Sequence, residues 1–294
     1  MIRYGVTDAE INAAVDAIDA RWRANASTRA GRIRRAGSYD EPSSTWSAVK
    51  PVFIDIQRNK CAFCERQLES VEYGRIEYDL EHFRPKSAVS TWPDPKRHPE
   101  LAYTFPTGAA GSGYHWLAYE LSNYAAACKI CNSVFKHDFF PIEGDRAHAH
   151  HTAAELALEL ALLCLPIGNA DDDPEDLLSF VATTARPRST EGRRSRRGRV
   201  IIDLFGLNVR EDLHRERARM IALIGPALLN MANGIGDATD EAVLKLAEDA
   251  RIPHANCVRS FRRLWDDDRP TALRAYRLCR VYGLQEPGAP PPQV

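Results

Sequence analysis

Two pairs of cysteines offer the clearest chemistry in this sequence. Each pair has two residues between its members, Cys61-Ala-Phe-Cys64 and Cys128-Lys-Ile-Cys131. This spacing lets both sulfurs of a pair bind one ion, and four thiolates complete the tetrahedron that structural zinc prefers. Because such a site has no open coordination position, we expect the zinc (Zn²⁺) to stabilise the fold rather than to catalyse a reaction. Four buried apolar cysteines or two disulfides are the alternatives.

The other cysteines do not extend this pattern. Cys164, Cys257 and Cys279 are scattered, and the seven cysteines make an odd number. The sequence does not open with a basic segment followed by an apolar core, and no apolar run approaches the roughly 20 residues of a membrane helix. We therefore expect a cytoplasmic protein with no membrane partner. A reducing compartment disfavours disulfides, so the paired spacing points to metal.

A second set of polar residues lies among the cysteine pairs. It consists of Glu81, His82, Asn123 and Asn132. A lone histidine in a strand is usually a surface or hydrogen-bonded residue, and an asparagine is often a turn residue. Here the histidine directly follows a carboxylate and lies between the two halves of a zinc site, and this combination favours catalysis.

These residues resemble the HNH endonucleases, whose core is a ββα-metal unit often held by a tetrathiolate zinc. The resemblance covers roughly residues 50 to 217. The residues that match the HNH core are Cys61-Ala-Phe-Cys64, Asp79-Leu-Glu-His82-Phe-Arg-Pro-Lys86, Asn123 and Cys128-Lys-Ile-Cys131-Asn132. Further segments are similar to the HNH nucleases found beside ABC-type ATPases in Septu-type and retron anti-phage defence systems. They are Tyr114-His-Trp-Leu-Ala-Tyr119 with Leu121-Ser-Asn123, and Arg197-Gly-Arg-Val-Ile-Ile-Asp-Leu-Phe-Gly-Leu-Asn208.

The resemblance implies a role for each polar residue. His82 would be the general base that takes a proton from the attacking water. Glu81 and Asn132 would hold one divalent cation, Mg²⁺ or Mn²⁺, through oxygen ligands. That cation would stabilise the charge that develops on the phosphate and on the leaving oxygen. Asn123 would hydrogen-bond the backbone and fix the loop that orients His82.

The sequence departs from the HNH pattern in three places. Glu81 stands where aspartate is commoner, and Asp79, two residues earlier on the same predicted strand face, is an alternative ligand. Asn132 stands where other members have histidine, and His137 is the alternative there. The 40 residues 83–122, between the histidine and the first asparagine, imply a large insertion between two strands.

Contacts with nucleic acid must come from local cations, because the net charge of the chain is only -1. We expect phosphates of DNA, with RNA as the alternative, to contact four basic residues near the motif. They are Arg84, Lys86, Lys129 and Lys136. The basic stretch Arg186–Arg199 contains no aromatic residue that could stack on a base, so we expect a solvated flexible loop there.

Hydrophobic patterns predict the elements that position these residues. Apolar and charged residues alternate over 76–82 and predict a strand, and residues 87–113, rich in Pro, Gly, Ser and Thr, predict a long loop. A short helix should follow the second cysteine pair within 128–140. Helices are also expected over 8–25, 46–57 and 153–163, with a loop over 29–37. Beyond residue 203 the pattern is mostly helical, with breaks at 225–226 and 233–236.

The sequence thus predicts an α+β protein in which a small zinc-stapled ββα-metal (HNH) core is embedded in a mostly helical protein. We expect an N-terminal helical segment over residues 1–50, the nuclease core with its zinc knuckle over 51–145, and a mostly helical C-terminal region over 146–294 that offers a docking surface for a partner.

The function that the HNH resemblance implies is metal-dependent hydrolysis of phosphodiester bonds in DNA. The resemblance implies a bacterial anti-phage effector that works with an ABC- or SMC-like ATPase. One alternative is a non-catalytic zinc knuckle that binds nucleic acid or protein, although such a module has no use for Glu81, His82 or Asn132. The other is a stand-alone HNH restriction nuclease.

Overall fold

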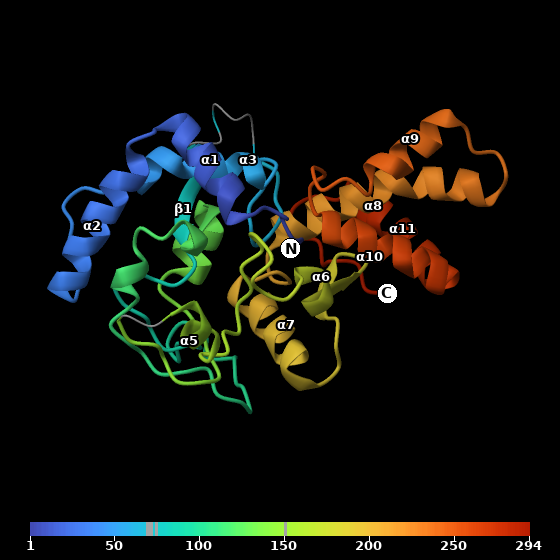
Figure 1. Cartoon of the computed structure of the whole chain (residues 1–294). Coiled ribbons are helices and arrows are strands. Elements are labelled where there is room, and N and C mark those ends of the chain that lie inside the picture. The colour runs from blue at the N-terminus through green and yellow to red at the C-terminus, as the bar shows by residue number, and fades with distance from the viewer. Residues whose placement is uncertain (69–72, 74–75, 150–151) are drawn as a thin grey trace. The chain divides into compact units, whose positions relative to one another are not determined.

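In the computed structural model, the described residues are 1–68, 73, 76–149 and 152–294. The chain divides into two compact units. The motif unit comprises Tyr4–Gln57 and Ser70–Asp171, and the helical unit comprises Met1–Arg3, Arg58–Glu69 and Asp172–Val294. The protein is mostly helical, and its described residues form two small two-stranded sheets (Figure 1). The α+β class expected from the sequence is confirmed.

The centre of the motif unit is an antiparallel pair of strands. Strand β1 (Tyr78–His82) pairs with β2 (Tyr124–Cys128), and His82 lies opposite Tyr124. All residues of β2 are buried, three of them alanines, which let other elements approach closely. Gln57 uses this space, because its amide both accepts from the N–H and donates to the carbonyl of Ala126, each at 2.7 Å.

The motif unit also contains several helical elements. The expected short helix after the second cysteine pair is present, with the wider winding of a π-helix, η4 (Ile130–Lys136). Such turns are rare and often mark functional sites. The other helical elements are α1 (Asp8–Ile18), α2 (Trp22–Ala36), η1 (Trp46–Val49), α3 (Lys50–Ile56), η2 (His115–Leu117), η3 (Leu121–Asn123) and α5 (Ala153–Ala157).

Two expectations for the N-terminal region are wrong. The helix predicted over 8–25 ends at Ile18, and residues 29–36 of the loop predicted over 29–37 belong to α2. Helix α2 buries Trp22, Ala26, Ala30 and Ile33, which recur on one face. Because two of these four are alanines among many arginines, their apolar pattern is weak in the sequence. Helix α1 begins with a capping box, in which the side chains of Thr7 and Glu10 each accept from the other's backbone N–H.

The predicted long loop over 87–113 is confirmed, and it is anchored near the motif. Isolated bridges join Val89 to Gly111 and Ser90 to Phe139. Trp92 is buried and packs against Phe139, with ring centroids 5.1 Å apart. The insertion is thus tied to the residues that directly follow η4. The helix predicted over 153–163 is shorter than expected and ends at Ala157.

The helical unit combines one hairpin with a group of packed helices. Strand β3 (Leu178–Val181) pairs with β4 (Thr184–Pro187), and α10 packs against β3. Helices α8, α10 and α11 pack against one another (Figure 1). None of the described helices has the length and apolar character that crossing a bilayer requires. The helices of this unit are α6 (Pro174–Leu177), α7 (Gly192–Leu204), α8 (Glu211–Ala232), α9 (Ala238–Leu246), α10 (Ala255–Asp267) and α11 (Arg269–Tyr282).

The expectation of a solvated flexible loop over Arg186–Arg199 is wrong. This stretch starts in β4 and continues into α7. Arg197 is buried, and its Nη1 donates to Asp172 Oδ2 at 2.6 Å. The helix forms because apolar residues that follow the arginines, such as Ile201 and Leu204, bury one of its faces.

Helix α8 runs through Gly225 and Pro226, where the sequence pattern predicted a break. A Cβ built on Gly225 would lie 2.2 Å from ring carbons of Tyr276 in α11. The glycine therefore permits the close packing of α8 on α11. The break predicted at 233–236 is confirmed, since α8 ends at Ala232.

Two glycines in helix interiors give opposite predictions. Gly225→Ala should destabilise the protein by about 1–3 kcal/mol, because the methyl group overlaps a packed ring. Gly31→Ala in α2 should stabilise it by roughly 0.5–1 kcal/mol, because a Cβ there meets only Arg35 Nη1 at 3.7 Å. Urea denaturation of both variants and the wild type measures the two changes. Equal effects at the two positions would contradict the packing described for α8.

Candidate active site

The four paired cysteines gather as their spacing predicts. Cys61, Cys64, Cys128 and Cys131 are buried, and their sulfurs all lie within 4.8 Å of one another. A zinc ion with Zn–S bonds of about 2.3 Å separates its sulfurs by about 3.8 Å, so the donor set fits this metal. The backbone N–H of Cys131 also donates to Cys128 Sγ at 3.5 Å. The cluster is consistent with a structural zinc site.

His82 stands at the end of β1 and is buried, with 5% of its surface exposed. Its Nε2 lies 3.0 Å from the carbonyl oxygen of Ala118. Because a carbonyl only accepts, Nε2 must carry the proton, and Nδ1 of the neutral ring keeps a lone pair. The rings of Trp46 and Tyr124 meet the imidazole edge-on, at 4.8 and 5.1 Å, and fix its orientation.

Electrostatics keep this ring uncharged. Burial and the nearby ammonium of Lys86 lower the pKa of His82 to about 3. The imidazole is therefore neutral at neutral pH. The Ala118 carbonyl that holds it is itself fixed, because the hydroxyl of Tyr124 donates to the same oxygen at 2.6 Å.

Glu81 is buried beside a lysine of η4. Its Oε1 pairs with the ammonium of Lys136, which also donates to the carbonyl of His82 at 3.1 Å. Lys136 has no exposed surface. Burial raises the pKa of Glu81, and the charge of Lys136 opposes that rise. One ammonium therefore holds both the carboxylate and the backbone at the end of β1.

Asn132 projects from η4 towards β1. Its Nδ2 donates to Asp79 Oδ2 at 3.0 Å, so the amide is oriented by a carboxylate and its oxygen is available to a ligand. Asp79, the alternative ligand from the sequence, thus contacts Asn132 directly. The other alternative, His137, has a positive φ of 47° and its Nδ1 lies 2.6 Å from Asp138 Oδ1.

Asn123 is buried, and its side chain hydrogen-bonds the backbone that follows His82. Its Oδ1 accepts from the N–H of Arg84 at 2.8 Å, and its Nδ2 donates to the carbonyl of Arg84 at 3.1 Å. The Arg84 side chain is fixed as well, because its Nε donates to the fully buried Glu159 at 2.9 Å. Nothing in the sequence identified Glu159, which lies 75 residues away along the chain.

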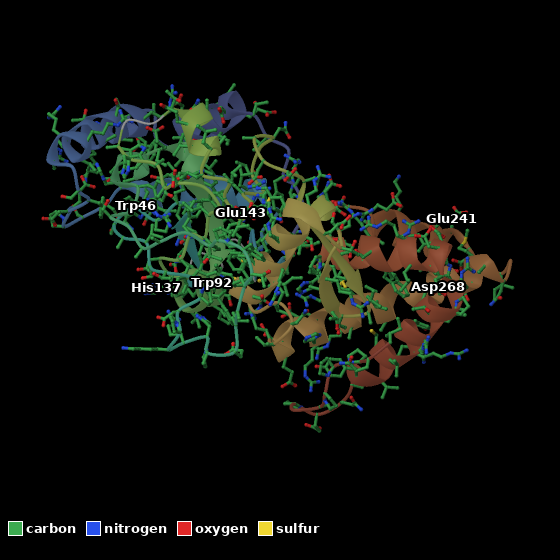
Figure 2. All side chains as sticks on the ribbon, turned by 90° about the horizontal axis from the view of Figure 1, so that it is seen from below. Trp46, Trp92, His137, Glu143, Glu241 and Asp268 are labelled. Atoms are coloured by element: carbon green, nitrogen blue, oxygen red, sulfur yellow. The ribbon has the colours of Figure 1, made fainter. Side chains whose placement is uncertain are left out.

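A cavity of about 250 Å³ collects several of the predicted residues. Glu81, His82, Lys86, Asn132 and His137 all line it, whereas Asp79, Arg84, Asn123, Lys129 and Lys136 do not. Trp46 and Asp138, which the sequence did not suggest, also belong to its wall; Trp46 and His137 are labelled in Figure 2. The remaining lining residues are Leu80, Pro85, Ser87 and Ala88.

The four basic residues expected to contact phosphates differ in accessibility. Lys86 lines the cavity, and its ammonium lies over the rings of Trp46 and Tyr39 at 4.9 and 5.2 Å. Lys129 is exposed just before η4. The charged groups of Arg84 and Lys136 instead point into the protein, towards Glu159 and Glu81 respectively.

Comparison with known proteins identifies a relative of this chain. The chain is 30% identical to the Septu protein PtuB of Bacillus mycoides (strain KBAB4) over 205 residues. The aligned stretch is 70% of this chain and 61% of that protein, so the chain spans less than two thirds of the relative's length. The two proteins are distantly homologous. No family model matches the chain, and no solved structure matches it.

Proposed function

We propose that this chain is a metal-dependent endonuclease of the HNH type, which hydrolyses phosphodiester bonds in DNA during anti-phage defence. The observation that carries the proposal is the His82 ring. It lines a cavity together with Glu81 and Asn132, and its Nε2–H is held by a carbonyl while Nδ1 keeps its lone pair. The distant homology to Septu protein PtuB supports the defence setting. RNA is the alternative substrate.

His82 is the general base of the proposed reaction. Its Nδ1 takes a proton from the water that attacks the phosphorus, while the bond to the 3′ oxygen breaks. The Ala118 carbonyl, 3.0 Å from Nε2, stabilises the imidazolium that results. Asn123 keeps the segment after His82 in place through its two hydrogen bonds to Arg84.

Glu81 and Asn132 are the residues that would hold the catalytic cation. A carboxylate and an amide oxygen are hard donors, which suit Mg²⁺ or Mn²⁺. When bound, such a cation stabilises the negative charge on the phosphate and on the leaving oxygen. The alternative ligand Asp79 instead orients the Asn132 amide.

We assign the four basic residues to two roles. Lys86 and Lys129, which reach the cavity or the solvent, contact phosphates of the substrate. Lys136 and Arg84 are positioning residues, because their charges are paired with the buried carboxylates of Glu81 and Glu159. This division explains why the chain can carry four cations near the motif while presenting only two of them to nucleic acid.

A non-catalytic zinc module is the second candidate function, and it would need the four cysteines alone. The oriented histidine and the oxygen donors around one cavity favour an enzyme over such a module.

We place partner docking in the C-terminal region, residues 146–294, and propose an ABC-type ATPase as the partner. Large apolar side chains exposed there suit a docking surface. They include Val209, Leu223, Ile235, Leu246, Val281 and Leu284.

Cleavage of plasmid DNA by the full chain tests this function. We expect weak nicking by the chain alone, stronger cleavage when the proposed ABC-type ATPase partner is added, and none when EDTA removes the labile divalent cation but leaves the zinc. Full activity in EDTA with zinc retained would refute the metal-dependent mechanism. Efficient cleavage without the ATPase would instead indicate a stand-alone restriction-type nuclease, and a stable complex that never cleaves would indicate a binding module.

A further inference from the structure

Positive charge is concentrated on helix α2. Six arginines lie within residues 21–36, and no aspartate or glutamate lies among them. The chain as a whole is nearly neutral, with 39 basic and 40 acidic residues, and a solvated protein surface usually mixes charges of both signs. This local excess therefore indicates a surface that binds an anion. The six residues are Arg21, Arg23, Arg29, Arg32, Arg34 and Arg35.

Three of the arginines share one face of the helix with two smaller polar residues. This row recurs at positions i, i+4, i+7, i+11 and i+14, and we call it the α2 stripe. All its members are exposed, and the face of α2 that bears the apolar residues is buried. At 1.5 Å per residue the stripe is about 21 Å long, the axial length of about six base pairs. It consists of Arg21, Asn25, Thr28, Arg32 and Arg35.

The protein itself neutralises little of the charge of the α2 stripe. Among the residues that the structure describes, no carboxylate forms an ion pair with Arg21 or Arg35. Arg32 shares Glu41 with Arg29, and its side chain is still 60% exposed. Such a pair contributes little, so a phosphate can replace it. Arg21 is also the N-cap residue, where the helix dipole disfavours a cation, so helix stability does not account for it.

The side chains of the α2 stripe suit duplex DNA better than a protein or a membrane. Arginine, asparagine and threonine commonly donate to phosphate oxygens. The stripe contains no large apolar side chain of the kind that anchors a protein partner or enters a bilayer, and its surface neighbours Ala24 and Gly31 are small. It also contains no aromatic ring that could stack on a base of single-stranded nucleic acid. The backbone of a duplex is therefore the ligand that fits.

A series of aromatic contacts connects α2 to the candidate active site. Trp22 of α2 packs on Tyr119, with ring centroids 6.4 Å apart. Tyr119 packs on Trp46 at 5.5 Å, and Trp46 meets the His82 ring at 4.8 Å. These three distances together are smaller than one turn of duplex DNA, which is about 34 Å long. A duplex engaged at His82 can therefore also reach α2.

We propose that the α2 stripe binds the phosphate backbone of duplex DNA and holds the duplex at the candidate active site. Arg21, Arg32 and Arg35 each contact one phosphate, and the stripe thus supplies affinity that does not depend on base sequence. A chain with a net charge of -1 requires such local contacts. The inference rests on the proposed nuclease function, which it deepens by naming a surface that positions the substrate.

Replacing the three stripe arginines tests the proposal in the full-length chain. Fluorescence anisotropy of a labelled DNA duplex, in EDTA, measures affinity without cleavage. For the combined variant Arg21→Ala, Arg32→Ala and Arg35→Ala, we expect the affinity to fall on the order of 10²-fold at about 0.1 M salt. The slope of log affinity against log salt should decrease by about 3, one for each phosphate contact. Lysine at the same three positions keeps the charge and should keep most of the affinity.

Three arginines of α11 provide the matched control. Arg274, Arg277 and Arg280 are exposed, and apolar side chains such as Leu278 and Val281 are exposed among them. Replacing these arginines with alanine changes the net charge of the chain by the same amount. We expect the DNA affinity and the salt slope of this variant to equal those of the wild type, because the effect depends on the place of the charge.

Cleavage kinetics separate this proposal from the proposed function. The alanine variant of the α2 stripe should keep the wild-type kcat while kcat/KM falls with the affinity, because only binding is lost. A wild type that binds the duplex but never cleaves it would refute the nuclease function. The stripe would still be supported in that case if its alanine variant loses affinity.

Several outcomes would overturn the proposal. Wild-type affinity in the alanine variant of the stripe would do so, as would a wild type that does not bind the duplex. An equal loss in the α11 variant would show that net charge explains the effect. Unchanged DNA binding with loss of the ATPase complex would assign the stripe to a protein partner. If the combined variant does not fold, each single substitution should lower the slope by about 1, and three unchanged slopes would contradict the proposal.

Discussion

Replacing Cys131 with serine is expected to leave a chain that neither folds nor holds zinc. Four thiolates form a closed site, and the metal has no site in the unfolded chain, so its binding energy is also folding energy. For structural zinc in small domains this energy is about 10–16 kcal/mol, as large as the roughly 5–15 kcal/mol that stabilises a typical domain. Cys131 is fully buried, so the serine hydroxyl is also left in a dry environment.

Cys279→Ser provides the matched control for the zinc prediction. Cys279 is equally buried but lies outside the cluster, and burial raises the pKa of its thiol, so it stays neutral. Its replacement should cost about 1–3 kcal/mol and leave one zinc per chain. Zinc content, circular dichroism and protease resistance distinguish the two variants. A soluble and fully folded Cys131→Ser protein without zinc would show that the cysteines are not a structural metal site.

His82→Ala is expected to lower the rate of DNA cleavage by about 10²- to 10⁴-fold, the usual contribution of a general base. Zinc content should not change, because His82 is not part of the cysteine cluster. The substitution also removes the ring that packs between Trp46 and Tyr124, so some loss of stability accompanies the loss of activity. Rates must therefore be compared per folded molecule.

A second histidine and added imidazole sharpen this test. His98 packs on Trp92 in the insertion and does not line the cavity, so His98→Ala should keep its activity. Free imidazole should restore part of the rate in His82→Ala, because it can enter the space left by the side chain and accept the proton. Undiminished cleavage by His82→Ala would rule out His82 as the base, whatever the metal requirement.

Local spacing allowed the cysteine cluster and much of the fold to be predicted. Two residues between paired cysteines make both sulfurs available to one ion, whatever surrounds them. Alternation before His82 predicts the strand, and the Thr7 capping box predicts the start of α1. These features depend only on the residue type and on neighbours a few positions away in the sequence, so they can be predicted without the fold.

The surroundings of the proposed catalytic residues could not be predicted in this way. Lys136 lies four residues beyond Asn132, and a lysine at that place is expected to bind phosphate. In the structure it is instead fully buried against Glu81. The carbonyl of Ala118, which selects the tautomer of His82, belongs to a residue 36 positions away. A backbone carbonyl carries no signature in its residue type, so no pattern could have indicated it.

The sequence by itself determined which side chains are able to bind zinc, accept a proton or offer oxygen to a cation, because these properties belong to the residue types. Only the tertiary structure decided what each charge is used for. Arg217, Lys136 and Arg84 are alike in sequence as cations, but packing surrounds them with different partners. Burial removes water, and a charge without water is governed by the groups that long-range folding places next to it.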